Sequence, residues 1–398
     1  MKICRKVSLL ILSLCLLSGC WDRTELNDLA LISALALDKS EDNQIQVTAQ
    51  ILVPQSQSSA GMMGVGGGGG GGATKHTIIR SAKGLNIADA LSKLQRVVPR
   101  KLFWGQCKIF IFSDTLARAG IHEHFDFMVR HPNPREHAYL LVSDGKAADA
   151  LELFPPIERT SAEVVRKLAE LQIGIKVTME QLSMMLKGDS QSASIPLVKI
   201  LPLSKSSAPF QTIPYIMGTA VFKKDKMVGE ISEKVTRGVM WIINEIKDYT
   251  ITFKIDEEDG LVSLNPVIAS VKLLPKIEGD TWSMTVKVRT EGTIVQNSSR
   301  VNPMDPDVVN ALDKAFENIV KERIQLALHE VQGRLQVDIF NFAKEFHRKY
   351  PNEWGKAKDN WDEIFPKVEV KTDVKAHIHR PGLVNAPGGM PKDGVKEN

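Results

Sequence analysis

The stretch NIADALSKLQRVVPRKLFWGQCKIFIF, residues 86–112, carries a helix pattern followed directly by a strand pattern. Asn86 can cap a helix, and Asp89 favours the positive end of the helix dipole. Apolar residues then recur at helical spacing until Pro99 stops the helix: Ile87, Ala88, Leu91, Leu94 and Val98. The run at 106–112 ends in Ile109-Phe110-Ile111-Phe112 and predicts a strand.

The same alternation of helices and strands continues on both sides of this stretch. Residues 115–129 and 147–153 predict helices, and 138–143 predicts a strand. Upstream, 30–37 and 44–53 predict a hairpin, in which apolar and polar residues alternate along 44–53 and indicate a half-buried strand. This order favours a sheet layered with helices.

The chain changes character after Pro155-Pro156 and again near Pro214. Between these points, helices are expected at 161–171 and 178–186, and a strand at 196–203. The second helix begins with the capping-box pattern Thr178-Met179-Glu180-Gln181. We therefore expect a small middle domain at 156–214.

Strands dominate the last part of the chain. They are expected at 216–222, 226–231, 249–255, 267–274, 282–295 and 368–379. Asp305 and Pro306 begin a helix whose apolar stripe continues to Tyr350, about 65 Å at 1.5 Å per residue, with a bend expected at Gly333. Such a stripe is more often core than a partner groove.

The predicted fold class is α+β (mixed α/β). It has three domains, each a small β-sheet packed with helices: an N-terminal domain at 20–155, the middle domain at 156–214 and a C-terminal antiparallel sheet with the long helix at 215–382.

The N-terminus reads as a bacterial lipoprotein signal. Lys2, Arg5 and Lys6 precede the apolar run 7–17, which is shorter than the roughly 20 residues that span a bilayer. Small residues lead to Cys20, so residues 1–19 are predicted to be a cleaved signal peptide, with lipid attached to the Cys20 sulfur. The alternative is an ordinary secretory signal with an incidental cysteine.

Two segments are expected to lack a fixed fold. Seven glycines at 66–72 predict a flexible loop over 54–74, because ordering them costs much backbone entropy. They lack the Gly-Lys-Ser/Thr sequence of a phosphate-binding loop. The tail at 383–398 is also expected to be disordered.

The charge and cysteine counts exclude several classes of protein. Three of the 51 basic residues lie in the signal, which leaves 48 against 47 acidic residues and no basic footprint for nucleic acid. Of four cysteines, only Cys107 remains beside the predicted lipid site. No intramolecular disulfide is then possible, and Cys107 is expected to be a buried small hydrophobe.

No catalytic, cofactor or metal motif stands out. His122, His124, His131 and His137 are close in sequence, and His377 and His379 share a strand face, but neither set has zinc-site spacing. The acidic turn 256–260 lacks the spacing of an EF-hand. We predict no enzyme, no cofactor and no metal site.

Four blocks of sequence together resemble one family. They are the segments 19–30 (GCWDRTELNDLA), 127–132 (FMVRHP), 218–229 (GTAVFKKDKMVG) and 360–366 (NWDEIFP). With these blocks in this order, the chain resembles the spore germination lipoproteins of the Ger(x)C type, the C subunits of nutrient germinant receptors. The resemblance runs from Cys20 to about residue 382 and departs at the seven glycines and the tail.

The resemblance implies a three-domain mixed α/β protein that is lipid-anchored on the outer face of the spore inner membrane. It also implies two integral membrane partner subunits, of A and B type, and a role in transmitting a nutrient signal. Only the lipid site, Cys20, carries over residue by residue. The alternatives are a free-standing solute-binding lipoprotein that captures a small nutrient and, more distantly, a cell-wall hydrolase.

Overall fold

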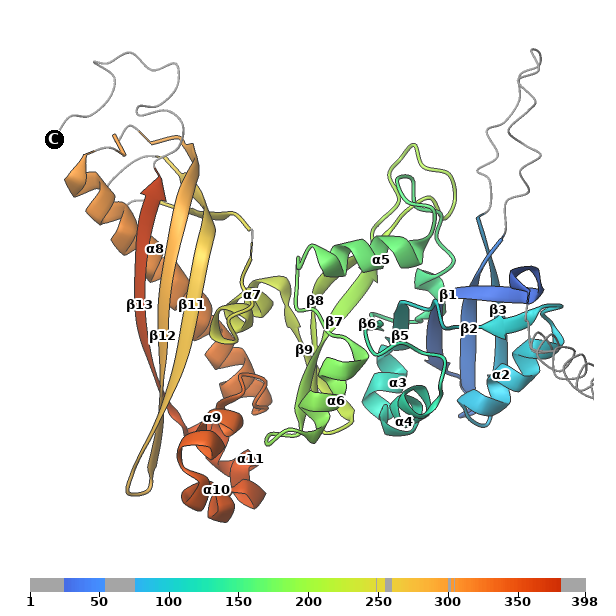
Figure 1. Cartoon of the computed structure of the whole chain (residues 1–398). Helices are drawn as coiled ribbons and strands as arrows, with labels where there is room; N and C mark the ends of the chain where they lie inside the picture. Colours follow the sequence, from blue (N-terminus) through green and yellow to red (C-terminus); the bar gives the residue numbers. More distant parts are fainter. Residues whose placement is uncertain are drawn as a thin grey trace, which may run out of the picture.

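The computed structural model describes residues 25–53, 76–247, 249–254, 260–299, 302–303 and 305–380. The predicted signal peptide, Cys20, the glycine-rich loop and the tail at 383–398 lie outside these ranges. The described chain forms two β-sheets that stand side by side, each with its own helices (Figure 1). Within these ranges no helix is long and apolar enough to cross a membrane.

The larger sheet has nine strands among the described residues, in the order β3-β2-β1-β5-β6-β7-β8-β9, with β4 beside the start of β1. Strands β1, β5, β6 and β7 are parallel, and the other neighbours on the main path are antiparallel. The strands are β1 Leu29–Lys39, β2 Ile45–Leu52, β3 Thr77–Gly84, β4 Lys101–Phe103, β5 Ile109–Ser113, β6 Tyr139–Ser143, β7 Ser192–Ile200, β8 Pro214–Lys223 and β9 Lys226–Ser232.

The β1–β2 hairpin confirms the predicted pair of N-terminal strands, with Leu37 opposite Val47. The expected solvent-facing side of β2 is wrong, because Thr48 and Gln50 are also fully buried. Gln50 donates from Nε2 to the Leu151 carbonyl and to Ser161 Oγ, both at 2.9 Å. The sheet is thus covered on both faces, and the polar side of β2 is used to hold the covering layer.

Helices surround this sheet as follows: η1 Leu26–Asp28, α2 Ile87–Arg96, α3 Asp114–Ala119, α4 His122–Arg130, η3 Ala148–Ala150, α5 Ser161–Glu170 and α6 Met179–Lys187. The predicted caps are confirmed: Asn86 accepts from the Asp89 N–H, and Thr178 with Gln181 forms a capping box. The single helix expected at 115–129 is wrong, because Gly120, at φ +126°, ends α3 before α4 begins. The helix expected at 147–153 is only the 3₁₀ turn η3.

The expected boundaries at 155 and 214 both fall within this one sheet. Strand β7, from the expected middle domain, pairs with β6 on one side and with β8 on the other. The expected N-terminal and middle domains therefore share a sheet instead of each forming its own. The start of the expected C-terminal domain, the β8–β9 hairpin, is also part of that sheet.

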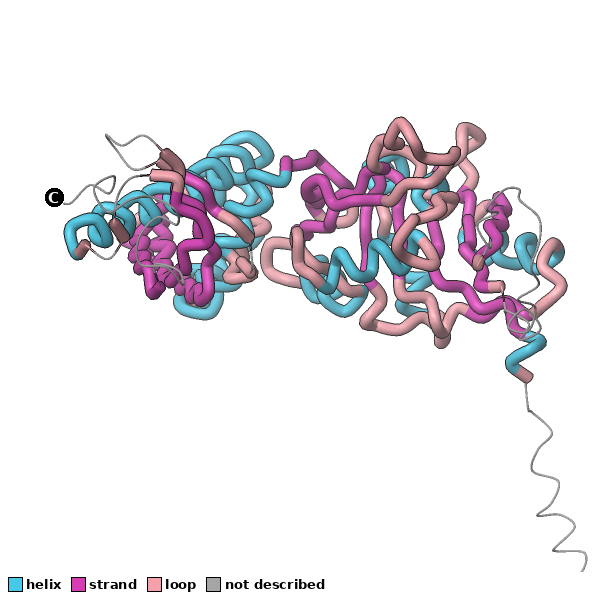
Figure 2. Tube along the Cα trace, turned by 90° about the horizontal axis from the view of Figure 1, so that it is seen from above, coloured by secondary structure: helices cyan, strands magenta, loops and turns pink. Residues whose placement is uncertain are grey.

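The smaller sheet has the order β10-β11-β12-β13, with β13 parallel to β12. Its elements, with the helices that follow the larger sheet, are α7 Glu233–Ile242, β10 Ile251–Phe253, β11 Val262–Glu278, β12 Thr281–Asn297, α8 Pro306–Ala327, the π-helix η4 Leu328–Leu335, α9 Phe342–Lys349, α10 Pro351–Ala357, η5 Lys358–Asn360, α11 Trp361–Ile364, η6 Phe365–Lys367 and β13 Glu369–Arg380. Helix α8 runs along one face of the sheet (Figures 1 and 2).

The long helix confirms its predicted start but not its predicted end. Asp305 accepts from the Asp307 N–H, and the apolar stripe is core, as expected: Val308, Leu312, Phe316, Val320, Ile324 and Ala327 are buried. The helix stops at Leu335 because Gln336 adopts a left-handed backbone at φ +55°. Gly333 lies inside the π-helix and does not mark the break. The apolar pattern continues to Phe346 because those residues pack around a buried carboxylate, described below.

Candidate functional site

Of the two cysteines in the predicted mature chain, the structure describes only Cys107. Cys20 lies outside the described residues, so its lipidation stays a prediction. Cys107 is fully buried in front of β5, and burial raises the pKa of its thiol to about 12. This burial confirms the prediction that Cys107 is a small core residue. A buried, protonated thiol is also a poor nucleophile.

Four of the six histidines singled out in the sequence have structural surroundings that are described below, and the other two, His122 and His137, are exposed. His124 is buried, and this burial lowers its pKa. The His131 and Trp104 ring centroids lie 4.4 Å apart, with the ring planes tilted by 52°. His377 Nδ1 lies 2.9 Å from Asp313 Oδ2, and His379 Nδ1 lies 3.8 Å from Glu291. No group of three or more His, Cys, Asp or Glu side chains in the described part of the chain could hold a metal ion. Of the acidic turn 256–260, only Gly260 is described.

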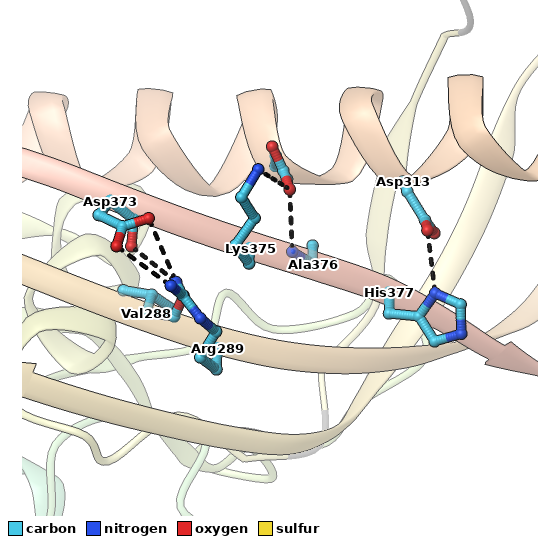
Figure 3. Close-up of polar contacts among 8 residues, drawn as sticks. Val288, Arg289, Asp313, Asp373, Lys375, Ala376 and His377 are labelled. Atoms are coloured by element: carbon cyan, nitrogen blue, oxygen red, sulfur yellow. Dashed lines mark hydrogen bonds and ion pairs between the residues drawn. The ribbon is translucent and has the colours of Figure 1, made fainter.

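Two carboxylates of α8 cover the outer edge of β13 (Figure 3). Asp313 accepts the Ile378 N–H at 2.8 Å and faces His377. One turn later, Glu317 accepts the Ala376 N–H at 3.4 Å and lies 3.6 Å from Lys375 Nζ. Because unpaired strand N–H groups invite pairing with another chain, this contact protects the edge of the sheet. His377 therefore belongs to a structural contact.

The two sheets meet at the tip of the β8–β9 hairpin. On one side of the tip, the Asp225 carbonyl accepts the Ile121 N–H at 2.9 Å. On the other side, Lys224 donates its N–H to the Gln191 carbonyl at 2.6 Å, and Lys223 Nζ lies 2.8 Å from Asp362 of α11. The hairpin tip thus contacts the α3–α4 turn, the turn before β7 and the C-terminal helices at once.

Asp338 is at the centre of the C-terminal part of this contact. Its carboxylate is 4% exposed and accepts N–H groups from Phe340 at 3.1 Å, Phe342 at 3.2 Å and Ala343 at 2.7 Å. It also accepts from Trp361 Nε1 at 3.2 Å. Burial nevertheless raises the pKa of Asp338 to about 6. The Asp338 carbonyl in turn accepts from Ser192 Oγ of β7, which ties the two sheets together.

Aromatic rings pack around Asp338. The closest ring pairs are Trp282–Phe346 at 4.7 Å and Trp354–Trp361 at 5.1 Å between centroids, with Phe340, Phe342 and Phe365 beside them. Gln332, in the π-helix, donates from Nε2 to the carbonyls of Phe365 at 2.9 Å and Val368 at 2.8 Å. We call this region, from the β8–β9 tip through residues 188–192 to Asp338 and α11, the junction.

A cleft of about 530 Å³ opens beside the junction. It is lined by Met184 and Met185 of α6, Lys344 of α9 and Glu245 after α7. Burial raises the pKa of the Glu245 carboxyl, and the nearby Lys176 partly offsets this effect. Asp189, on the same cleft, lies 2.9 Å from His347 Nδ1.

The junction brings together two of the sequence blocks noted above. The block 218–229 forms the β8–β9 hairpin, and the block 360–366 contributes Trp361 and Asp362. The block 127–132 ends α4, where Phe127 and His131 pack on Trp104. Asp338 and Glu245 were missed from the sequence. A sequence feature that could have pointed to them is a single acidic residue inside an apolar run. Asp338 has apolar neighbours on both sides, whereas Glu245 follows Asn244 and stands out less.

This arrangement joins parts of the molecule. The Asp338 carboxylate is occupied by four N–H donors, and Lys223 and Asp362 form an exposed ion pair. Among the residues described around the junction, we find no nucleophile held by a base. The geometry therefore favours a site that fixes the relative position of two structural units.

Comparisons with known proteins agree over most of the chain. The family described as "Spore germination protein N-terminal domain" matches residues 22–200, and "Spore germination B3/ GerAC like, C-terminal" matches 217–382. Spore germination protein KC of Bacillus subtilis (strain 168) is 28% identical over 96% of this chain and 97% of its own length. Spore germination protein B3 of the same organism is 24% identical over 96% of this chain and all of its own.

A solved structure supports the fold. "Crystal Structure of the GerBC protein" matches with a TM-score of 0.57 at 19% identity, covering 87% of this chain and 96% of that one. At this identity the likeness shows the fold alone. The mixed α/β class predicted from the sequence is confirmed by this match and by the two sheets.

Proposed function

Because this chain belongs to the family of spore germination proteins of the B3/GerAC type, we propose that it is a lipid-anchored, non-enzymatic subunit of a spore nutrient germinant receptor. A role in germination follows from the family. The anchor, the partners and the mode of action are the proposal. The mature chain begins at Cys20, carries lipid on its sulfur and lies on the outer face of the spore inner membrane.

The proposed anchor is supported by the sequence before the described residues. An apolar run of eleven residues, 7–17, followed by Ser18-Gly19-Cys20, fits a lipoprotein signal. A diacylglyceryl thioether carries two acyl chains, and two acyl signals are what stable membrane attachment requires, at about 0.8 kcal/mol per buried CH₂.

The proposed non-enzymatic mode is supported by the junction. Its buried carboxylate, Asp338, is satisfied within the fold, and its rings form one packed cluster. A body of two joined sheets of this kind is suited to transmit a signal by contact with two integral membrane subunits of A and B type. The observation that carries the proposal is the end-to-end match with the germination family, including the relatives named proteins KC and B3.

Affinity purification from spore membranes tests the proposed complex. The chain is tagged after Asn398 and solubilised in mild detergent. We expect two multi-spanning membrane proteins to copurify in constant ratio. The matched control is the Cys20→Ala chain, which lacks the anchor and is expected to be lost from the membrane fraction with both partners. A tagged wild-type chain that purifies without any integral membrane protein would contradict the proposal.

The second candidate is a free-standing solute-binding lipoprotein. The observation that favours it is the cleft beside the junction, where the partly buried Glu245 carboxyl faces Lys176. A bound nutrient would stabilise the fold by about 2.7 kcal/mol at 100 times its dissociation constant. A thermal-shift screen with amino acids and sugars therefore separates the two functions. A saturable shift that Glu245→Gln abolishes would favour solute capture.

A further inference from the structure

Two loops rise together beside α5 (Figure 1). One connects η3 to α5 at 153–160, and the other connects β7 to β8 at 201–213. They are joined by a hydrogen bond from the Phe154 N–H to the Phe210 carbonyl at 2.8 Å. We call them the paired loops.

The paired loops present apolar side chains to solvent. Ile157 is 90% exposed, Phe210 54%, Leu203 52% and Leu201 44%. Single exposed aliphatic residues are ordinary on a protein surface, but apolar residues gathered on neighbouring loops mark a contact with another phase or molecule. We therefore expect these four side chains to contact another molecule or a membrane.

This exposure is imposed by the loop backbone. Thr212 Oγ1 donates to the Leu201 carbonyl at 2.6 Å, and the Leu201 N–H donates to the Ile213 carbonyl at 2.9 Å. Phe210 adopts φ +64°, a left-handed conformation that is costly for a bulky residue. The fold thus holds the Phe210 ring at the surface by a fixed and strained turn.

The paired loops lie close to the start of the N-terminal strand. A surface cavity of about 620 Å³ is lined both by Leu31 and Ser33 of β1 and by Glu158 and Arg159, which follow Ile157. Leu29, which begins β1, stands nine positions after Cys20, at most about 30 Å of extended chain. A lipid on Cys20 therefore keeps this end of the molecule near the bilayer.

The charge around the cavity suits an anionic surface. Glu158 pairs with Lys167 at 2.6 Å, and Glu163 pairs with Arg166. Arg166 also pairs with Glu170. With Lys108 and Arg159, which line the same cavity, four basic side chains stand against three acidic ones, an excess of one positive charge. Basic residues near a membrane are attracted to anionic headgroups.

From these observations we propose that the paired loops insert into the interface of an anionic bilayer, with Ile157 and Phe210 as the inserted side chains. A bilayer interface accepts neighbouring aliphatic residues and one aromatic ring without a shaped groove, which fits this surface. A flexible lipid tether alone leaves the body free to rotate. The second contact would fix the orientation of the body on the bilayer, so that the junction keeps a constant position relative to the membrane. The proposal rests on the proposed function only for the position of the anchor.

A site-specific dye tests the insertion without the lipid. The chain from residue 20 with Cys20→Ala keeps one thiol, Cys107, which is fully buried. A solvent-sensitive dye is attached to Phe210→Cys, and vesicles of phosphatidylglycerol and phosphatidylcholine are added. We expect a blue shift of the emission and quenching by brominated lipids.

The matched control is Leu85→Cys, labelled in the same way. Leu85 is 80% exposed and follows Gly84, which pairs with Ile45 at the start of β2. The cavity beside the paired loops is lined by Leu52, at the other end of β2. No shift is expected at this position. Equal responses at positions 85 and 210, or none at either, would overturn the proposal.

Vesicle partitioning gives the second readout. Ile157→Ser together with Phe210→Asn should weaken binding at least about tenfold, whereas Leu85→Ser should leave it unchanged. Asn tolerates the left-handed backbone at 210, so this variant should keep the fold, which circular dichroism verifies. A dye response that needs the membrane subunits in the vesicles would show a protein occupant and overturn the proposal. Because all these chains lack lipid, their result is independent of whether Cys20 is acylated in the spore.

Discussion

Replacing Asp338 by Asn tests whether its carboxylate stabilises the junction. One oxygen, Oδ2, accepts from the Ala343 N–H at 2.7 Å and from Trp361 Nε1 at 3.2 Å. The other, Oδ1, accepts from the Phe340 and Phe342 N–H groups. An amide has one oxygen and one NH₂ group, so either orientation of Asn leaves two buried N–H donors facing another donor.

The expected loss of stability follows from these two donors. A buried donor without an acceptor costs about 1–3 kcal/mol, so Asp338→Asn should lower the free energy of unfolding by about 2–6 kcal/mol. That is a large part of the roughly 5–15 kcal/mol that stabilises a typical domain. The effect is expected in the C-terminal part of the molecule, where the rings of Trp282, Trp354 and Trp361 pack around this carboxylate.

Urea unfolding measures this loss. Tryptophan fluorescence reports mainly on the C-terminal unit, because four of the six tryptophans, Trp241, Trp282, Trp354 and Trp361, lie there, and circular dichroism reports on both units. The matched control is Asp359→Asn on η5, an exposed residue nearby, which should stay within about 0.5 kcal/mol of wild type. An Asp338→Asn chain that is as stable as this control would refute the assignment of Asp338 as the acceptor that holds the turn.

Three further outcomes are expected. Gly238→Ala should destabilise the chain by about 1–3 kcal/mol in urea unfolding, because its Cβ would stand 2.1 Å from the Arg323 carbonyl oxygen, where α7 packs on α8; unchanged stability would show that these helices are not in close contact. Burial raises the pKa of Cys107 to about 12, so its thiol should not react with a disulfide reagent at pH 8 until urea unfolds the chain, and rapid reaction of the native chain would contradict this. Lys223→Ala should cost less than about 1 kcal/mol, since Lys223 and Asp362 are 37% and 55% exposed; a larger loss would show that the ion pair, not Asp338, carries the junction.

Local features of the fold were predictable because their causes are local. The turn at 40–43 between two apolar runs predicts the β1–β2 hairpin, and the Asn86 cap and the stripe along α8 follow from side-chain type and spacing. The same reasoning fails where a helix shows no alternation of apolar and polar faces. In α7, five consecutive residues, 238–242, are buried, so the helix has no polar face by which to recognise it there.

Long-range pairing was not predictable from spacing. Strands β6 and β7 are about 50 residues apart in sequence, and no pattern in either strand shows that they pair. For the same reason the middle segment resembled a separate domain. Gln50 resembled a solvent-facing residue because its partners, the Leu151 carbonyl and Ser161, come from a segment a hundred residues away.

The candidate site was only partly predictable. The blocks containing Lys223 and Trp361 stood out in the sequence, but their meeting place did not. Asp338 was hidden because the apolar repeat of α8 continues through it at helical spacing. The left-handed turn at Gln336, which ends the helix, has no glycine to signal it.

The central claim is that this chain acts in germination while held to the membrane through Cys20. The most direct measurement compares nutrient-triggered germination of spores that lack the chain and carry either the wild-type or the Cys20→Ala copy. The account predicts that the wild-type copy restores germination, whereas the Cys20→Ala copy is lost from the membrane fraction and does not. Normal germination with the Cys20→Ala copy, or with no copy at all, would contradict it.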